Sequence, residues 1–321
     1  MVAGPAPSLR IVFFGTPAFA VPTLEALLRS PHPVVAVVTQ PDRPHGRGHH
    51  VTDGPVKACA RQHDLPVLQP ERLRAPGVLE ALASYRADLG VVAAYGKLLP
   101  PAILATPRLG MINVHASLLP KYRGAAPVHR AVMAGEAETG VTIMRIVEAL
   151  DAGPMLALVR RPIDPDDTSD LVERDLARLG ADLLVEVVDR LARGPMAEVP
   201  QDEQLATYAP RLTRGDGLID WTRSARAIHN QVRGLHPWPL AFTYLEGRRL
   251  IVRRTAPAPA PSAASPGTII EAAADRLLVA TGEGVLAVRE LQLEGRRPVG
   301  ARDFLSGHPV QAGAVLLPGP S

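Results

Sequence analysis

The chain has 321 residues and a formal net charge of +3, a length that allows two domains, each with its own core. Cys59 is its single cysteine, which excludes an intrachain disulfide and a metal site made of several cysteines, and fits a reducing cytoplasm. No stretch approaches the ~20 apolar residues that span a bilayer. Residues 1–8 are rich in Pro and Ala, unlike a signal peptide. We expect a cytoplasmic protein with a disordered start and no membrane contact.

Charge is divided unevenly along the sequence. Residues 210–321 contain 14 Arg and no Lys against 9 Asp and Glu, a balance of +5. The totals of 35 basic and 32 acidic residues therefore leave 21 against 23, or −2, for residues 1–209. A basic second part indicates an anionic partner, of which nucleic acid is the obvious candidate. A solvated basic surface is the alternative, and charge alone does not decide between them.

Short apolar runs alternate with stretches of helical spacing in the first part of the chain. The expected strands are 9–14, 34–39, 66–68, 88–94, 111–114, 139–147 and 155–162. The expected helices are 17–29, 55–63, 75–86, 125–134 and 168–193. Apolar strands that alternate with helices are typical of a mostly parallel sheet covered on both faces. We therefore predict a Rossmann-like α/β domain over residues 9–194.

The pattern changes after a polar connector, which we place at residues 195–210. One helix is expected at 224–234. It is followed by short β-like runs at 241–246, 250–255, 268–271, 277–280 and 285–291. Short strands with Gly-containing turns indicate a small β-barrel, OB-like in type, over residues 211–316. The Pro-, Ala- and Ser-rich segment 256–266 is expected to be an irregular excursion from it.

The most informative stretch begins at residue 111. Asn113 and His115 are two apart on a predicted strand, so their side chains leave the same face of the sheet. A loop and then a helix follow, and open α/β sheets bind their ligands at such strand ends. A lone histidine there would more often be a buried residue satisfied by a backbone carbonyl. The pairing with an amide favours a functional site.

A third polar residue, Asp151, follows another strand of the same predicted sheet. An amide can donate to a developing oxyanion, an imidazole can move a proton near neutral pH, and a carboxylate can orient the imidazole or a water. No Ser or Cys is placed as a nucleophile beside Asn113 and His115. Direct transfer of an acyl group to an amine is therefore more natural than an acyl-enzyme, although Asp151 alone would more often be a turn residue.

Two other patterns exclude common functions. Gly15-Thr16-Pro17 is not a dinucleotide fingerprint, and Pro17 lacks the backbone donor that a phosphate needs, which disfavours a nicotinamide dehydrogenase. His45, His49 and His50 fall in a Gly- and Pro-rich loop without evident carboxylate support, so solvated side chains are favoured over a metal site. Arg43 and Arg47 in the same loop suit contacts to phosphate. We predict no metal.

The stretch Asn113–Pro127 resembles the signature of folate-dependent formyltransferases. Further motifs match the members that act on methionyl initiator tRNA, namely Gly15–Pro17, Thr39–Pro44, Gly46–Gly48, Glu138–Thr142, Leu150–Gly153, Ile219–Trp221, Pro237–Pro239 and Pro266–Ile269. The resemblance covers about residues 9–305. In one departure, His49 and His50 stand where these members usually have Lys, which puts in question the charge of the loop and not the activity.

The resemblance implies a function and a set of site residues. The co-substrate would be 10-formyltetrahydrofolate, and Asn113, His115 and Asp151 would be catalytic. The folate site would be formed by Ser117, Leu118, Leu119, Pro120, Tyr95, Lys97 and Leu99, the last three through the backbone around them. The loop 40–51, with Arg43 and above all Arg47, would enter the acceptor end of methionyl initiator tRNA, and the barrel would lie along the tRNA. We expect a monomer.

Other functions remain open from the sequence. Formylation of a small amine, such as a ribonucleotide or a sugar nucleotide, or hydrolysis of formyltetrahydrofolate, would use the same first domain. The basic second domain with Pro237–Pro239 argues against these reactions. A tRNA-binding protein with an inactive first domain is a third reading, against which Asn113, His115 and Asp151 are all present. The sequence does not give the oligomeric state, the rates or the degree of preference for initiator tRNA.

Overall fold

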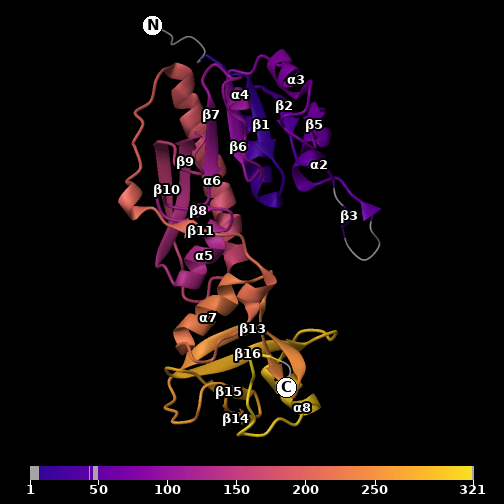
Figure 1. The fold of residues 1–321 in the computed structure, drawn as a ribbon, viewed down its shortest axis with the longest axis vertical. Helices are drawn as coiled ribbons and strands as arrows, with labels where there is room; N and C mark the ends of the chain where they lie inside the picture. The colour runs from indigo at the N-terminus through magenta and orange to yellow at the C-terminus, as the bar shows by residue number, and fades with distance from the viewer. Residues whose placement is uncertain (1–6, 43, 46–49, 320–321) are drawn as a thin grey trace. The chain divides into compact units, whose positions relative to one another are not determined.

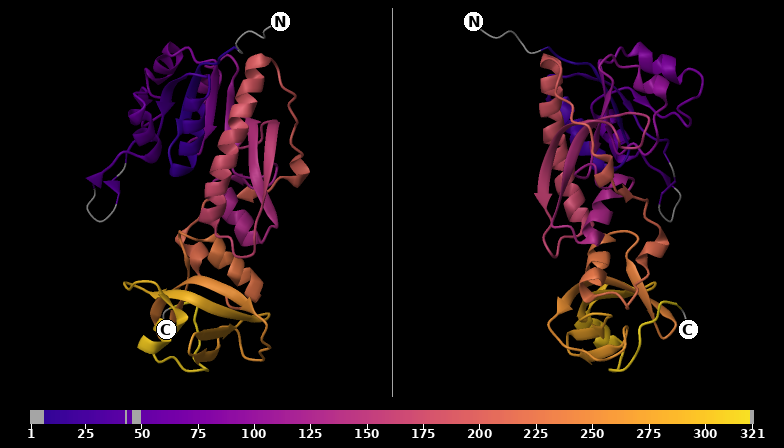
Figure 2. Two further views of the ribbon diagram at one scale, coloured as in Figure 1. Left: turned by 180° about the vertical axis from the view of Figure 1, so that it is seen from behind. Right: turned by 60° about the vertical axis from the view of Figure 1, so that its left-hand side comes forward.

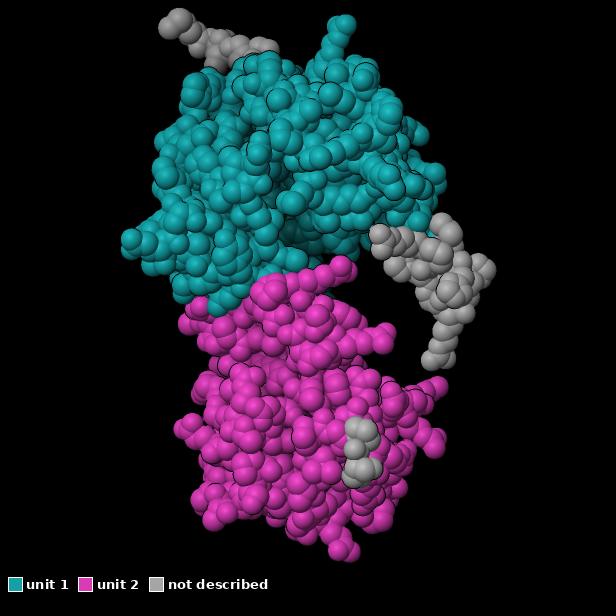
Figure 3. Space-filling model, in the orientation of Figure 1, with its two compact units in different colours: residues 1–127, 138–162, 173–209 teal, residues 128–137, 163–172, 210–321 magenta. Residues whose placement is uncertain are grey.

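The structure is a computed structural model that describes residues 7–42, 44–45 and 50–319. The chain divides into two compact units (Figure 3). Unit 1 comprises residues 1–127, 138–162 and 173–209, and unit 2 comprises residues 128–137, 163–172 and 210–321. The sequence predicted two domains, residues 9–194 and 211–316, joined by a connector at 195–210. These domain boundaries stay a prediction.

Unit 1 contains a seven-stranded sheet with the order β10-β9-β7-β6-β1-β2-β5. Its strands are β1 Ile11–Gly15, β2 Val34–Val38, β5 Val67–Leu68, β6 Leu89–Ala93, β7 Met111–His115, β9 Glu138–Arg145 and β10 Met155–Pro162. The five strands from β7 to β5 pair in parallel, whereas β9 is antiparallel to both β7 and β10. The prediction of a mostly parallel, Rossmann-like sheet is confirmed.

Helices follow most of these strands (Figure 1). They are α1 Val21–Arg29, preceded by the 3-10 turn η1 Ala18–Ala20, α2 Pro55–Gln62, α3 Val78–Ser84, α4 Pro101–Leu104, α5 Pro127–Ala134 and α6 Ser169–Arg193. Leu82 of α3 and Ile103 of α4 join the apolar cluster that contains Met111. The four-residue helix α4 was not expected, because one helical turn leaves almost no periodicity in a sequence.

Helix α6 packs against the face of the sheet opposite to α3 and α4, and it runs beside β7 and β9 in the ribbon views of Figures 1 and 2. Gly180 allows this close approach. A Cβ added there would lie 2.9 Å from Val114 Cγ1 and 3.1 Å from Val141 Cγ1. Since side chains alternate along a strand, Val114 faces α6, and Asn113 and His115 leave the other face of β7.

Two segments that the sequence indicated only as loop or connector contain short strands. The two-residue strands β3 Pro44–His45 and β4 His50–Val51 pair in antiparallel fashion. Within 195–210, Val199 forms a bridge with Met155, η2 spans Glu203–Leu205, and β11 Tyr208–Ala209 pairs in parallel with β8 Arg123–Gly124. The connector therefore runs in register against the chain that follows β7.

Unit 2 is built around an antiparallel sheet with the order β12-β13-β16-β15-β14, with β17 paired to β16. Its elements are η3 Arg214–Gly217, α7 Ala225–Gly234, β12 Ala241–Leu245, β13 Arg248–Ala258, β14 Ile269–Ala273, β15 Arg276–Ala280, β16 Val285–Leu293, β17 Val299–Gly300 and α8 Ala301–Gly307. Trp221, Ile228 and Val232 pack with Val252 and Leu291 in its core. The predicted small barrel-like domain is confirmed.

The expectation of an irregular excursion from residue 256 is wrong for its first three residues. Strand β13 continues to Ala258, and Ala256–Ala258 pairs with β16. Pro257 is tolerated because β12 pairs with β13 only as far as Val252, so one edge of β13 is open beyond that point. The seven-residue helix α8 was also not expected from the sequence.

Candidate active site

Asn113 and His115 lie at the carboxyl end of β7, beside the end of the parallel strand β6. Asn113 is half-buried and His115 is buried. Within the described part of the chain, the side-chain amide of Asn113 makes no hydrogen bond. The structure thus brings together the amide and the imidazole that the sequence pattern placed on one face, and it leaves the amide open to a ligand.

The tautomer of His115 is fixed by a backbone carbonyl. Its Nε2 lies 3.0 Å from the carbonyl oxygen of Tyr122, which can only accept a hydrogen bond, so Nε2 carries the proton. In the neutral ring Nδ1 is then the nitrogen free to accept. Tyr122 has a φ of +61°, a left-handed conformation that turns its carbonyl toward the ring.

Asp151 joins this pair from the turn between β9 and β10. Its Oδ2 lies 3.7 Å from His115 Nδ1, too long for a direct hydrogen bond, and the two form an ion pair only when the ring carries a second proton. The same oxygen accepts a 2.8 Å hydrogen bond from the backbone N–H of Gly124. The carboxylate is therefore held facing the nitrogen that is free to take a proton.

The loop that follows β7 is held in shape by a buried hydroxyl. Thr142 Oγ1 donates to the carbonyl of Ser117 at 2.8 Å and accepts from the backbone N–H of Leu119 at 3.2 Å. Ser117 Oγ donates to the carbonyl of Lys121 at 2.7 Å, while Leu118 and Pro120 are half-buried. Sequence reasoning gave Thr142 no role, although it lies in the motif Glu138–Thr142, and the antiparallel pairing of Thr142 with His115 explains its position.

The residues after β6 contribute differently from one another. The ring of Tyr95 is buried in an edge-to-face contact with Phe14, at 5.5 Å between centroids, and burial raises the pKa of its hydroxyl to about 12. Its carbonyl accepts a 2.8 Å hydrogen bond from Gln40 Nε2. Lys97 Nζ donates to the carbonyl of Glu71 at 2.9 Å, and Leu99 packs against the core. The side chain of Tyr95 thus belongs to the core, and that of Leu99 is partly buried against it.

Arg43 and Arg47 lie outside the described residues, but the two ends of the loop that contains them are joined by salt bridges. Lys57 Nζ contacts Asp42 Oδ2 and lies 3.0 Å from Asp53 Oδ1. These hydrogen bonds hold the pKa values of both carboxyl groups below their usual range and raise that of the ammonium group. Sequence reasoning missed Lys57, since only folding brings the two ends of the loop to one cation.

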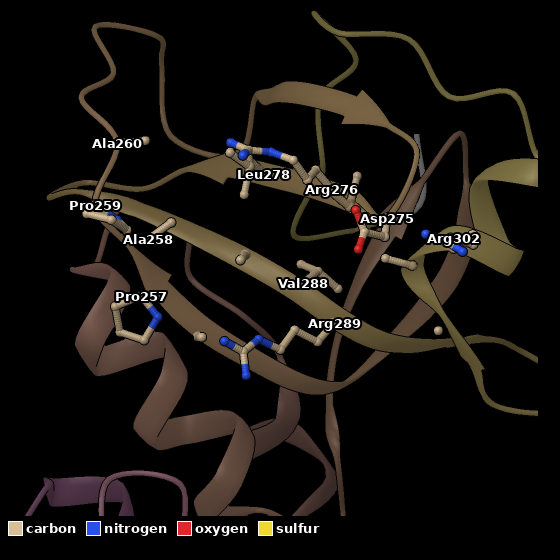
Figure 4. A pocket seen from close by; sticks show the side chains of 15 residues that line it. Pro257, Ala258, Pro259, Ala260, Asp275, Arg276, Leu278, Val288, Arg289 and Arg302 are labelled. Carbon is tan, nitrogen blue, oxygen red and sulfur yellow. The ribbon is translucent and has the colours of Figure 1, made fainter.

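Unit 2 contains a groove of about 700 Å³ on the barrel. The exposed side chains of Arg276, Arg289 and Arg302 lie on different sides of it (Figure 4). Arg276 pairs with Glu271 at 2.7 Å. Arg289 and Arg302 make no ion pair within the described residues, and Asp275 is the acidic residue in the lining.

In residues 7–42, 44–45 and 50–319, no group of three or more His, Cys, Asp or Glu side chains is arranged to hold a metal ion. Over the same ranges, no helix has the length and apolar character required to cross a membrane.

Comparison with known families identifies the class of protein that this fold and site define. The model of the formyl transferase family matches residues 9–188, and the model of its C-terminal domain matches residues 211–309. The chain belongs to the formyl transferase family.

Two curated relatives of high identity share the name of one enzyme of this family. The chain is 49% identical over 308 residues to methionyl-tRNA formyltransferase of Citrifermentans bemidjiense, covering 96% of each chain. It is 47% identical over 311 residues to methionyl-tRNA formyltransferase of Halalkalibacterium halodurans, covering 96% of this chain and 98% of the relative.

Solved structures share the fold at low sequence identity. WlaRD, a sugar 3N-formyl transferase determined with dTDP and 5-N-formyl-THF, has a TM-score of 0.67 at 15% identity, with 90% of this chain and 99% of that chain covered. HypX from Aquifex aeolicus in complex with tetrahydrofolic acid has a TM-score of 0.61 at 16% identity, with 93% of this chain and 47% of that chain covered. At this identity the likeness concerns the fold alone.

Proposed function

We propose that the protein transfers the formyl group of 10-formyltetrahydrofolate to the α-amino group of methionyl initiator tRNA. The observation that carries the proposal is the arrangement at the end of β7. There the amide of Asn113, which has no hydrogen bond among the residues that the structure describes, stands beside a histidine whose Nδ1 faces Asp151 at 3.7 Å. The identity of 49% to an enzyme named methionyl-tRNA formyltransferase over nearly the whole chain supports the choice of acceptor.

Each of the three residues has one task in this reaction. As the methionyl amine attacks the formyl carbon, the formyl oxygen gains negative charge, and the Asn113 amide donates a hydrogen bond to it. His115 takes the proton from the amine at Nδ1, while Nε2 keeps its proton and its bond to Tyr122. Asp151 stabilises the imidazolium that results. The bond between the formyl carbon and N10 then breaks, and N10 receives the proton from His115 Nδ1, so that tetrahydrofolate leaves and the ring is neutral again.

The folate co-substrate would bind along the loop Ser117–Pro120. Thr142 fixes the backbone of Ser117 and Leu119 on the side of the sheet and so presents the loop in one conformation. The backbone near Tyr95, Lys97 and Leu99 would form the other wall, at the end of the neighbouring strand β6. A rigid wall of this kind lowers the entropy cost of binding.

Nucleic acid would be bound by both units. In unit 1 the loop 40–51 would carry Arg43 and Arg47 to the acceptor end of the tRNA, with its two ends tied together by Lys57. In unit 2 the balance of +5 suits phosphate oxygens, and so do Arg289 and Arg302 in the groove, which form no ion pair in the described part of the chain. Guanidinium groups in an open groove contact a backbone without reading its sequence.

The alternative is a formyltransferase that acts on a small amine, or a hydrolase. Neither reaction needs a second domain rich in arginine. The two relatives that match 96% of this chain are named methionyl-tRNA formyltransferase, and neither is named for a small amine or for hydrolysis. We propose further that the protein is a cytoplasmic monomer. Sedimentation of the free protein at micromolar concentration tests the monomer, and a dimer would contradict it.

The decisive experiment follows formyl transfer from labelled 10-formyltetrahydrofolate to methionyl initiator tRNA, with methionyl elongator tRNA as the matched control. Label on the initiator alone is the expected result. Label on neither RNA, with folate still bound, would overturn the proposed acceptor and direct the search to small amines. Release of formate at the same rate with and without RNA would instead identify a hydrolase.

A further inference from the structure

Gln201 lies in the connector 195–210. Its side-chain carboxamide contacts two segments of the candidate active site, the turn that contains Asp151 and the segment that contains Arg123. Its Nε2 donates to the carbonyl oxygens of Asp151 at 2.8 Å and Gly153 at 2.7 Å. Its Oε1 accepts from Arg123 Nε at 3.1 Å and Nη2 at 2.9 Å. All four contacts lie within unit 1 and use the full capacity of the amide in one orientation.

The turn that receives these two donors is left-handed at Asp151, which has a φ of +49°. Asp tolerates this conformation in turns better than most residues other than glycine do. On the other side Gly153 abuts β9, where an added Cβ would lie 1.9 Å from the carbonyl oxygen of Arg145. The turn is thus enclosed between β9 and Gln201, and the carboxylate of Asp151 is aimed at His115 from this enclosed position.

The other partner of Gln201 anchors the loop that fixes His115. Arg123 is only 2% exposed, and Glu203 holds its guanidinium with two further hydrogen bonds of 2.7 and 2.9 Å, which raise the pKa of the arginine. Tyr122, whose carbonyl accepts from His115 Nε2, immediately precedes it. The next residue, Gly124, donates to the carboxylate of Asp151. Gln201 therefore joins the segment that sets the tautomer to the turn that carries the carboxylate.

We propose that Gln201 is a positioning residue for the formyl transfer. Gln201 keeps the carboxylate of Asp151 3.7 Å from Nδ1 of His115. Because Gln201 is part of the connector 195–210, this distance depends on the connector being ordered. The inference rests on the proposed function for its kinetic consequence. The inference also concerns the geometry of the Asp151 turn, which can be measured in the free protein without an acceptor for the formyl group.

The test uses two alanine variants on the same connector. Gln204 is exposed, and its side chain makes no hydrogen bond within the described residues, so Gln204→Ala is the control for Gln201→Ala. We expect Gln201→Ala to lower kcat by about 10- to 100-fold, the usual effect of a misplaced catalytic group, with KM for folate little changed. Gln204→Ala should keep the kcat of the unmodified protein.

A double-mutant cycle separates positioning from a general loss of structure. In an Asp151→Asn background, Gln201→Ala should cost less than about 2-fold, since the charge that it positions is already gone. An equal loss in both backgrounds, or no loss in either, would overturn the proposal. If Gln201→Ala lowers the melting temperature strongly, Gln201→Glu serves in its place, because it keeps the acceptor for Arg123 and removes both donors to the turn.

Hydrogen exchange supplies the measurement that is independent of the acceptor. Deuterium uptake in a peptide covering residues 146–156 should rise in Gln201→Ala and not in Gln204→Ala. Unchanged uptake would contradict the inference even if activity falls. Failure of the unmodified protein to formylate any tRNA would refute the proposed function instead, and the exchange result would still decide whether Gln201 holds the turn.

Discussion

The carboxylate of Asp151 lies 3.7 Å from Nδ1 of His115, although His115 ends β7 and Asp151 follows β9. The other ring nitrogen is occupied by the carbonyl of Tyr122. One side of the imidazole therefore has a fixed proton and the other faces a negative charge. In the proposed mechanism the ring takes the proton of the amine at Nδ1 and returns it afterwards.

Removal of either residue of the β7 pair should abolish most of the activity. Loss of one oxyanion donor typically costs on the order of 100-fold in rate, so Asn113→Ala and His115→Ala should each lose at least this much in kcat. Folate binding, measured by calorimetry, should be largely retained. His63→Ala, at an exposed histidine on the same unit, is the control. Near-normal turnover in Asn113→Ala or His115→Ala would remove these residues from the catalytic set.

Thr142→Val should weaken both the fold and folate binding. Thr142 is fully buried, and valine of similar shape would leave the carbonyl of Ser117 and the N–H of Leu119 without their partner. Each unsatisfied buried group costs about 1–3 kcal/mol. Urea denaturation should show a loss in this range, together with a raised KM for folate. Thr106→Val, at a more exposed hydroxyl at the end of α4, should change stability by less than about 0.5 kcal/mol. Equal effects of the two changes would contradict the role of Thr142.

Lys57→Met should impair the use of tRNA more than the use of folate. Without the ammonium group, Asp42 keeps its hydrogen bond from Gln69 and Asp53 its contact with Arg61. The repulsion between the two carboxylates, which Lys57 no longer offsets, then separates the two ends of the loop 43–52. We expect a higher KM for tRNA with kcat at saturating tRNA little changed. Arg61→Met removes only the exposed contact to Asp53 and should have a smaller effect. A rise in KM for folate alone would argue against this account.

Arg47→Ala should weaken tRNA binding most at low salt. A side chain that neutralises one phosphate contributes about one unit to the slope of log K against log salt concentration. Titration of labelled tRNA at several salt concentrations should show the slope reduced by about this amount. Arg29→Ala, at an exposed arginine of α1 paired with Glu25, is the control. An unchanged slope in Arg47→Ala would place this arginine away from the RNA.

His229 should make unit 2 less stable in mild acid. Burial lowers the pKa of its imidazole below the ordinary value of 6.5, and nearby Arg233 acts in the same direction against the weaker pull of Asp166. Nε2 donates to the carbonyl of Pro165 at 2.9 Å, and Nδ1 accepts from Thr255 at 3.1 Å. The unfolded chain therefore binds a proton more readily than the folded one as the pH falls through 6.5.

The resulting loss of stability is at most about 1.4 kcal/mol per pH unit for one group. Urea denaturation at several pH values between 5 and 7.5 measures it. In His229→Gln this part of the pH dependence should disappear, whereas His63→Gln, at an exposed histidine, should retain it. A pH dependence that is identical in His229→Gln and the unmodified protein would show that another group is responsible.

The sequence by itself determined the sheet, the barrel-like domain and the grouping of the polar pair. Alternation with a period of two puts Asn113 and His115 on one face of any strand that contains both, whatever the strand packs against. Apolar runs between helical stretches leave few options other than a parallel sheet. Because Asp151 follows another predicted strand of the same sheet, the sequence also predicted that Asp151 lies near Asn113 and His115.

The tertiary structure decided which atoms act on these side chains. The carbonyl of Tyr122 fixes the tautomer of His115, and Gln201 holds the turn of Asp151 from a segment that the sequence indicated only as a polar connector. Lys57 likewise joins two carboxylates on either side of a loop. Such contacts depend on the path of the chain between distant positions, and residue type and spacing carry no information on that path.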